Sequence, residues 1–372
     1  MEVKSISLVN FRLFDNISFD FEDKNVILGK NGSGKTSVIE AINYCSTFSP
    51  LRTYETDMDL VKVGKSYFNI SLDFDDVNGL KNNIFVGYEI TGGKAKKKVK
   101  FNGKTTSPSS VFGKLKVIPF LIEDFELVVG SPLWRRKVVN EFLILVDSSY
   151  YHNLINYHKI IKQKNASIRM IKEIEEQKPA NMKDLILQIK ELIMTYNANI
   201  SKFAFEVTKY RANLFKYIRE TMLSELDLNL DIRYKSSMYE IMKTSEDPIT
   251  DFTNLLNKEI DKEILYGKSI IGPHLDDFII TSEGGKLAKS FLSQGQIRLV
   301  SIMFKLSMAN YLYKETKVLP VLLIDDVLGE LDEGNKIKIF DRVFSKPYQI
   351  VLSFYEIPDY INKSDFNIIE LG

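Results

Sequence analysis

Hydrophobic and polar residues alternate through most of the first 90 residues, which predicts a chain that begins with β-strands. Strand patterns run through "VKSISLVNFR", "NISFDF", "NVILG", "SYFNISLDFDD" and "NIFVGYEI". A helical pattern over residues 35–46 interrupts them. We expect the next segment, "TGGKAKKKVKFNGK", to form a hairpin whose tight turn is Asn102-Gly103.

The periodicity changes after the apolar segment "KVIPFLIED" (116–124), which is typical of a buried strand. Ser131 and Pro132 suit the N-cap and first position of a helix. From there apolar residues recur at helical spacing up to about residue 227, with a break at "QKPANMKD" (177–184). The middle of the chain is therefore predicted to be helical.

Strand patterns return in the last third of the chain, at "LNLDIRY" and "FIITSEGGKL". They are followed by a helix over 296–313, the apolar strand "VLPVLLIDD", a further helix and a last strand at "YQIVLSFY". The pattern predicts an α/β fold in which both ends of the chain build one sheet around a helical middle.

Composition narrows the class of protein. The 372 residues are 44% hydrophobic and 27% charged, and the formal net charge is +1, so any contact with nucleic acid must come from a local patch. No apolar run approaches the roughly 20 residues that span a bilayer. The single cysteine, Cys45, excludes an internal disulfide and lies on the apolar side of a predicted helix, where we expect a small buried side chain. These features favour a soluble cytoplasmic protein.

The stretch "GKNGSGKT" fits the phosphate-loop pattern G-x-x-x-x-G-K-[ST] between an apolar strand and a helix. Its glycines allow backbone N–H groups to turn toward an anion, and the helix that follows adds a partial positive charge. Lys35 is expected to pair with the β- and γ-phosphates of ATP, and the Thr36 hydroxyl to bind Mg²⁺. The predicted ATP-binding residues are Gly29, Lys30, Asn31, Gly32, Ser33, Gly34, Lys35 and Thr36.

The strand in "VLPVLLIDDVLGELD" ends in two adjacent aspartates. A carboxylate at such a strand end can hold Mg²⁺ beside a phosphate loop, which assigns the metal to Asp325 together with Thr36. Asp326 is then placed to orient or deprotonate the attacking water. On this segment alone, two carboxylates that cap the turn are an equally good interpretation.

The stretch "FLSQGQIRLVSIMFKLSMANYL" opens a long apolar-striped helix with small and polar residues. A helix N-terminus of this kind can bind an anion, and a second anion site far from the phosphate loop indicates that one chain's loop faces another chain's turn. The predicted trans signature residues are Ser293, Gln294, Gly295 and Gln296. An ordinary polar cap is the alternative.

At this point the chain resembles the ABC-type ATPases, because "LSQGQ" is similar to their signature and "GELD", with Asp332, to their D-loop. The resemblance implies an ATPase head. Its phosphate-loop lobe would comprise 1–122 and 308–372, and its helical signature-bearing lobe 123–307. The spacing between Lys35 and Asp325 exceeds that of transporter motors, and the helical segment is far shorter than SMC coiled coils.

Finer motifs resemble the RecF family of bacterial recombinational-repair ATPases: "NFRLF", "IEDFELVVGSPLWRR", "YYHNLINYHKIIKQKN", "GPHLDD", "LSQGQIR" and "LLIDDVLGELD", in the family's order. The resemblance implies ATP-dependent dimerisation on DNA and weak, DNA-stimulated hydrolysis that drives release. It also implies recombinase loading at gapped DNA or single-strand/double-strand junctions, with RecO and RecR as partners, and roles in replication and the SOS response to DNA damage. A nucleoid-associated cytoplasmic location and no membrane contact follow. A structural SMC-like clamp and a transporter motor are the alternatives.

The chain departs from the family pattern at a few positions. Lys164 stands where the family commonly has arginine, and Leu275 where a basic residue is usual. No glutamine occupies the metal-sensing place of transporter motors, where Glu123 or Asp124 are candidate substitutes. Ser353 stands where transporters have a histidine. The residue that senses the γ-phosphate therefore stays open.

Candidate DNA contacts are basic residues in two places, and a solvated surface is the more common role of such runs. They are Lys96, Lys97 and Lys98 on the predicted hairpin and Arg135 and Arg136 at a helix start. Neither segment has interleaved aromatic residues, which single-strand stacking requires. The resemblance implies that Arg12 approaches the nucleotide or DNA, and a surface arginine in a turn is an equally good interpretation. Asp276 and Asp277 are expected to shape a turn beside His274.

Overall fold

The computed structural model describes residues 1–52, 55–222, 226, 228–282, 284–327, 333–344, 346–358 and 361–372. The chain divides into two compact units, Met1–Val146 with Ala288–Gly372, and Asp147–Leu287. The first unit is built from both ends of the chain, as the sequence predicted. The lobe boundaries predicted after 122 and before 308 differ from those of the compact units, and that functional division stays a prediction.

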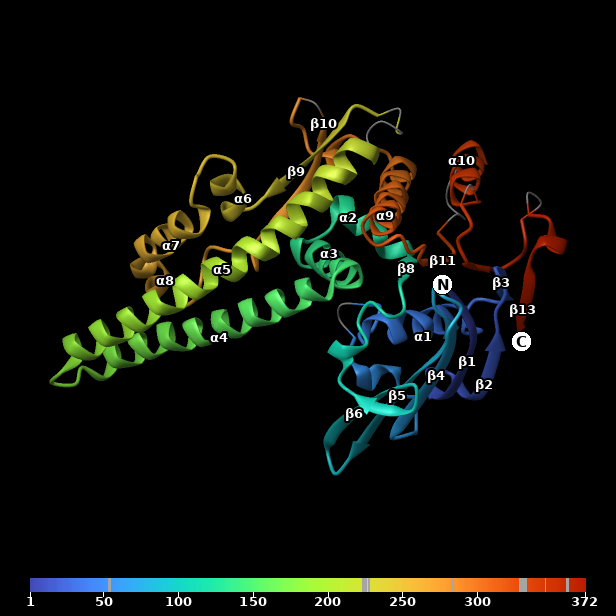
Figure 1. Ribbon diagram of the computed structural model, residues 1–372, viewed down its shortest axis with the longest axis horizontal. Coiled ribbons are helices and arrows are strands. Elements are labelled where there is room, and N and C mark those ends of the chain that lie inside the picture. Colours follow the sequence, from blue (N-terminus) through green and yellow to red (C-terminus); the bar gives the residue numbers. More distant parts are fainter. Residues whose placement is uncertain are drawn as a thin grey trace. The chain divides into compact units, whose positions relative to one another are not determined.

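The first unit contains a six-stranded antiparallel sheet in the order β2-β1-β4-β5-β6-β7 (Figure 1). The alternation of hydrophobic and polar residues in the sequence appears as alternating burial in the strands. In β4, Ile70 and Leu72 point into the core, while Ser71 between them faces outward. The strands are β1 (Glu2–Phe11), β2 (Phe14–Asp20), β4 (Tyr67–Asp75), β5 (Lys81–Thr91), β6 (Lys94–Phe101) and β7 (Lys104–Thr106).

The predicted hairpin is confirmed at its turn. β6 pairs with β7 across Asn102 and Gly103, which have φ of 49° and 77°. Positive φ at both central residues is what a type I′ turn requires, and asparagine and glycine adopt it at low cost.

A second sheet of the first unit is parallel, with the order β13-β3-β12-β11-β8. Its strands are near-continuous apolar runs, because both faces of a parallel sheet are covered. They are β3 (Lys24–Gly29), β8 (Val117–Phe120), β11 (Val321–Asp325), β12 (Ile350–Phe354) and β13 (Asn367–Leu371). The apolar segment predicted as one strand over 116–124 is strand only to Phe120, and β13 is a strand that the sequence pattern did not predict.

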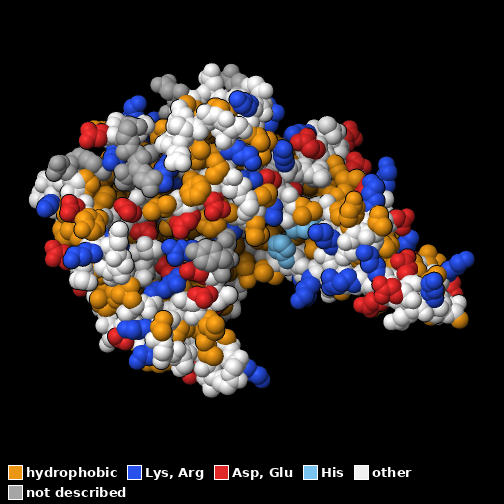
Figure 2. Space-filling view, turned by 180° about the vertical axis from the view of Figure 1, so that it is seen from behind, with side chains coloured by type: hydrophobic (Ala, Val, Ile, Leu, Met, Phe, Trp, Pro, Cys, Tyr) orange, Lys and Arg blue, Asp and Glu red, His pale blue; other side chains and the backbone are white. Residues whose placement is uncertain are grey.

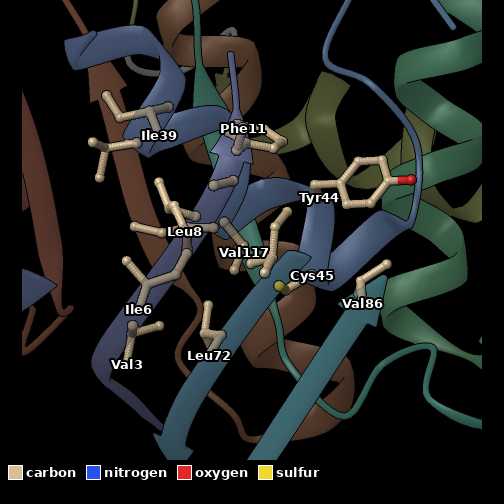
Figure 3. Close-up of a cluster of buried hydrophobic side chains, with 14 of the residues drawn as sticks. Val3, Ile6, Leu8, Phe11, Ile39, Tyr44, Cys45, Leu72, Val86 and Val117 are labelled. Carbon is tan, nitrogen blue, oxygen red and sulfur yellow. The ribbon is translucent and has the colours of Figure 1, made fainter. Parts of the chain in front are cut away.

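Helix α1 (Lys35–Thr47) packs against strands of both sheets, and a hydrophobic core of the first unit forms around it. Figure 3 shows Ile39, Tyr44 and Cys45 of this helix among side chains of β1, β4, β5 and β8. Cys45 is fully buried, which confirms the small apolar role expected from its position. The core thus holds α1 in place, with the helix N-terminus directly after β3 and the phosphate loop.

Helix α9 (Gln294–Thr316) belongs to the same unit and packs against α3 (Pro132–Val146), α2 (Glu126–Val129) and β8. Ser293 is its N-cap and Pro132 opens α3, in agreement with the predicted helix starts. Helix α10 (Glu333–Phe344) is the next described element after β11 in the chain. Short 3₁₀ turns in the described part of this unit include η1 (Asp57–Leu60), η3 (Ile122–Phe125) and η5 (Ala288–Ser290).

The second unit is dominated by two long helices, α4 (Ser148–Gln177) and α5 (Met182–Met222), which pack together along their length. The break predicted at 177–184 is confirmed between them, where Lys178 ends α4 in the left-handed region. The shorter elements are β9 (Leu230–Lys235), α6 (Ser237–Met242), α7 (Pro248–Lys258), α8 (Ile260–Tyr266) and β10 (Asp277–Ser282). β9 and β10 pair antiparallel as an isolated ribbon.

No described helix has the length and apolar content needed to cross a membrane. Basic and acidic side chains are interspersed on the face of the molecule shown in Figure 2, in keeping with the net charge of +1.

Candidate nucleotide-binding site

The phosphate loop occupies the turn between β3 and α1, as its sequence required. Gly34 is the N-cap of α1 with φ 105°, a left-handed conformation that disfavours any residue with a Cβ. The ring of Phe14 also lies against it, and a Cβ on Gly34 would be only 2.5 Å from that ring. The "NFRLF" segment and the loop therefore pack together, which gives this motif a physical role.

The Lys35 side chain is directed back over the loop. Its Nζ donates hydrogen bonds to the carbonyl oxygens of Gly29 at 2.7 Å and Lys30 at 3.1 Å, and the residue is buried. An ammonium held over backbone at a helix N-terminus is placed to meet a phosphate.

The end of β11 meets the start of α1 although the two are far apart in sequence. The Thr36 hydroxyl donates to Asp325 Oδ2 at 2.7 Å, across 289 positions. On the other side, Ser353 of β12 donates to Asp325 Oδ1 at 2.6 Å. Parallel strands β3, β12 and β11 end at the same edge of the sheet, which brings the two hydroxyls and the carboxylate together. A hydroxyl–carboxylate set of this kind suits Mg²⁺, which prefers oxygen ligands.

Asp326 follows as the first residue beyond β11. It has φ 51° and is exposed, unlike the buried Asp325. Left-handed backbone at an aspartate is uncommon and often marks a functional turn. The two carboxylates are therefore inequivalent, one held by hydroxyl donors and one facing solvent. The predicted D-loop residue Asp332 lies outside the described residues.

The signature segment forms a reciprocal cap on α9. Gln296 N donates to Ser293 Oγ at 3.3 Å and Ser293 N donates to Gln296 Oε1 at 2.9 Å. Gln294 is exposed, and a Cβ at Gly295 would meet nothing within 4 Å. The N-terminus of this helix therefore has open space beside Gly295.

Asp124 and Glu123, the two candidates for the missing glutamine, have different surroundings. Asp124 is buried, accepts a hydrogen bond from Leu121 N and pairs with Lys305 of α9 at 3.0 Å. Burial raises the pKa of Asp124, and the charge of Lys305 offsets part of that rise. Glu123 pairs with Arg52 at 3.2 Å and keeps 36% of its side chain exposed. The Asp124 carboxylate is thus held in the protein interior, so Glu123 is the better candidate to take the place of the missing glutamine.

Arg12, which the sequence placed near nucleotide, DNA or solvent, makes a bidentate pair with Glu40 of α1 at 2.7 and 3.0 Å. It also bonds Glu55 at 2.5 Å. No pattern in the sequence indicates these partners, because they come from a helix and a loop. Arg12 fixes the turn after β1 to the helix that carries the phosphate loop.

The candidate DNA contacts separate into two groups. Lys97 pairs with Asp57 at 2.8 Å and donates to the carbonyl of Phe48, and Arg135 is buried with a hydrogen bond to the carbonyl of Gly130. Lys96 and Lys98 are exposed, and Arg136 is partly exposed. Charges already held inside the protein are poor candidates for phosphate contacts, which leaves the exposed Lys96 and Lys98 as the better candidates.

In the second unit, the "GPHLDD" segment is a turn held by a buried network. Asp276 accepts a hydrogen bond from Tyr234 at 2.5 Å and pairs with Arg211 at 3.4 Å, while the Tyr157 hydroxyl bonds His274 Nδ1 at 2.6 Å. Asp276 thus stabilises the turn before β10, the role expected from the sequence.

Comparisons with known proteins agree with this geometry. A family model described as the RecF/RecN/SMC N-terminal domain matches residues 2–356. The DNA replication and repair protein RecF of Clostridium acetobutylicum is 30% identical over 382 residues, covering 100% of this chain and 98% of the relative. RecF of Thermoanaerobacter sp. strain X514 is 30% identical over 354 residues, with 92% and 91% covered.

Solved structures add the fold. A structure of the recombination mediator protein RecF with ATP has a TM-score of 0.84 and 25% identity, covering 97% of this chain and 94% of its own. An Smc head bound to the C-terminal winged helix of ScpA has a TM-score of 0.52 and 14% identity, a likeness of fold alone. Because the family model spans residues 2–356 and a RecF relative is 30% identical over the whole chain, this chain belongs to the RecF family of the RecF/RecN/SMC proteins.

Proposed function

We propose that this chain is a DNA-binding ATPase of recombinational repair that dimerises when ATP joins the phosphate loop of one protomer to the signature helix of another. The observation that carries the proposal is the hydrogen bond between Thr36 and Asp325, which joins the phosphate loop to the acid strand. The likeness to RecF structures with ATP supports ATP as the nucleotide.

Each residue of the site has a distinct part in this proposal. The N–H groups of the loop and the N-terminus of α1 bind the β- and γ-phosphates. When ATP binds, Lys35 Nζ gives up its hydrogen bonds to the loop carbonyls and pairs with these phosphates instead. Thr36 and Asp325 would hold Mg²⁺, which neutralises phosphate charge when bound. Ser353 keeps Asp325 oriented through its 2.6 Å hydrogen bond.

Hydrolysis then needs a group that orients water. Asp326 lies one residue beyond the metal-binding position, is exposed, and can accept a proton from an attacking water. Ser293 and Gly295 of a second protomer complete the γ-phosphate site, because the start of α9 is open to an approaching chain. Weak hydrolysis, stimulated by DNA, opens the dimer and releases it.

The cellular role in the proposal comes from the relatives. The related structures belong to a recombination mediator in the RecFOR pathway, which supports RecO and RecR as partners. Gapped DNA as the substrate is what the family resemblance implies. A cytoplasmic, nucleoid-associated location goes with that role. An SMC-like structural clamp is the second candidate, favoured only by the shared head fold.

The test uses Asp326→Asn. Asparagine tolerates the left-handed backbone of this position, so the turn keeps its shape. We expect ATP binding and ATP-dependent dimerisation on gapped DNA to persist while hydrolysis falls by about a hundredfold or more. Wild-type hydrolysis in this variant would contradict the assignment of Asp326, and loss of ATP binding would contradict the division of roles between Asp325 and Asp326.

A further inference from the structure

The surface of the antiparallel sheet that faces away from the core carries both lysine and aromatic side chains. Across β4, β5 and β6 the inward positions are apolar or half-buried, and the outward ones gather in a shallow concavity. We call this surface the outer face. Its residues are Tyr67, Asn69, Phe85, Gly87, Glu89, Lys96, Lys98 and Lys100.

The strand alternation sorts the lysine run into two sets. Lys94, Lys96, Lys98 and Lys100 occupy alternate positions of β6, while Lys97 lies between them on the inward side, where it pairs with Asp57. Two residues along a strand advance about 7 Å. In the part of the chain that the structure describes, Lys96 and Lys98 make no ion pair, although Glu89 lies opposite Lys96 in the register. The outer face therefore has a row of regularly spaced positive charges.

Two aromatic rings lie near this row: Phe85 of β5 pairs directly with Lys100, and Tyr67 of β4 lies one strand further away, opposite Glu89. Gly87 pairs with Lys98 on one side and with Asn69 on the other, so a position without a side chain lies at the centre of the concavity. Tyr67, 39% exposed, and Phe85 lie two residues away from this pair along β4 and β5. Lys100 Nζ is 5.3 Å from the centre of the Phe85 ring. The register thus interleaves rings and lysines that are distant in sequence.

We infer that the outer face binds single-stranded DNA, with bases stacked on Tyr67 and Phe85 and phosphates paired with Lys98 and Lys100. This rests on the proposed DNA-binding function and adds where, and to which form of DNA, the protein binds. An exposed tyrosine ring and a half-buried phenylalanine ring beside lysines suit unpaired bases, because stacking needs a free base face and tolerates any sequence. In duplex DNA those faces are covered by neighbouring base pairs, so a duplex would use the lysines alone.

The interaction is measured by fluorescence anisotropy with labelled oligodeoxythymidine and with a duplex of equal length, in the absence of nucleotide. We expect the wild type to bind the single strand more tightly. The variant Lys98→Gln/Lys100→Gln should bind it more weakly, and the slope of log affinity against log salt should fall by about 0.7 for each lysine lost. Tyr67→Leu/Phe85→Leu should bind about tenfold more weakly with the slope unchanged.

A matched control removes two charges elsewhere. Lys235 and Lys258 are exposed lysines of the second unit, and Lys235→Gln/Lys258→Gln should bind the single strand like the wild type. All of these variants should keep ATP binding and ATP-dependent dimerisation, because none touches the phosphate loop or α9.

The possible outcomes separate this inference from the proposed function. Wild-type binding of single strands by both outer-face variants would overturn the inference and leave the ATPase proposal intact. Loss of duplex and single-strand binding in the lysine variant, with no effect of the aromatic one, would show a backbone contact without stacking and would also overturn it. A wild-type protein that binds no DNA in any nucleotide state would contradict the proposed function itself.

Discussion

At the residue scale, nucleotide binding by the phosphate loop depends on Lys35, whose side chain is held in position by backbone carbonyls of the loop. Lys35 Nζ bonds two loop carbonyls, so the ammonium is already beside the anion cradle. The sequence predicted its role because strand, glycine turn and helix are adjacent in the chain. The hydrogen bonds from Ser353 and Thr36 to Asp325 were harder to predict, because they require knowing which strands are neighbours in the sheet.

The first prediction is that Lys35→Ala weakens ATP binding by about tenfold or more, since a charge-assisted contact to phosphate is lost. Lys30→Ala is the matched control: it removes an exposed lysine of the same loop, whose expected contribution is its backbone. Titration with ATP measures both. Equal affinities for the two variants would mean that loop charge, and not the placement of Lys35, controls binding.

At the element scale, several helix and turn positions followed from local sequence patterns, whereas the contacts between elements did not. The N-caps of α3 and α9 and the turn at Asn102-Gly103 were predictable because each depends on a few adjacent residues. The aromatic residues near the lysines were missed because strand register alone brings Phe85 beside Lys100 of β6 and Tyr67 beside Glu89 of β5. β13 was missed because a short strand at the sheet edge has a weak pattern.

The departure from the family at Lys164 also has an element-scale explanation. Lys164 of α4 and Glu263 of α8 form an ion pair at 2.7 Å with both side chains fully buried. Burial lowers the pKa of Lys164 and raises the pKa of Glu263, and each partner's charge opposes the other's shift. Neither residue's neighbours in sequence indicate this pair.

We therefore expect Lys164→Met to cost about 3–5 kcal/mol, because it leaves a buried carboxylate without its cation. Lys164→Met/Glu263→Leu should recover most of this loss. Lys190→Met is the control, since Lys190 joins α5 to Asp261 of α8 by an exposed pair expected to contribute less than about 1 kcal/mol. Urea unfolding of the three variants measures these differences, and equal losses for Lys164→Met and Lys190→Met would contradict the expectation.

The same variant should show a definite pH dependence. Without Lys164, the pKa of Glu263 rises further above its unfolded value, so the folded protein favours the protonated carboxyl. A raised carboxyl pKa stabilises the fold below the unfolded pKa, and this stability is lost as pH rises through the folded pKa. Lys164→Met should therefore lose less stability at about pH 5 than at about pH 8. The opposite trend would show that Glu263 stays ionised in the variant.

At the scale of the whole molecule, both ends of the chain build the unit that carries the phosphate loop, the acid strand and α9, and the second unit is an insertion between them. An ATPase head of this kind has an incomplete nucleotide site by itself in our proposal, because Ser293 and Gly295 would contact the γ-phosphate bound to another protomer. In this proposal the dimer, and not the monomer, is therefore the hydrolytic species.

Analytical ultracentrifugation of Ser293→Arg with ATP tests this claim most directly. Ser293→Ala removes the N-cap at a cost of about 1 kcal/mol without added bulk and serves as the control. We expect Ser293→Arg to bind ATP normally yet remain monomeric and inactive, because its side chain fills the space before α9. Mixing it with Lys35→Ala should restore dimers and partial hydrolysis, since one site combines an intact loop with an intact signature. Normal ATP-dependent dimerisation and hydrolysis by Ser293→Arg alone would contradict the shared site.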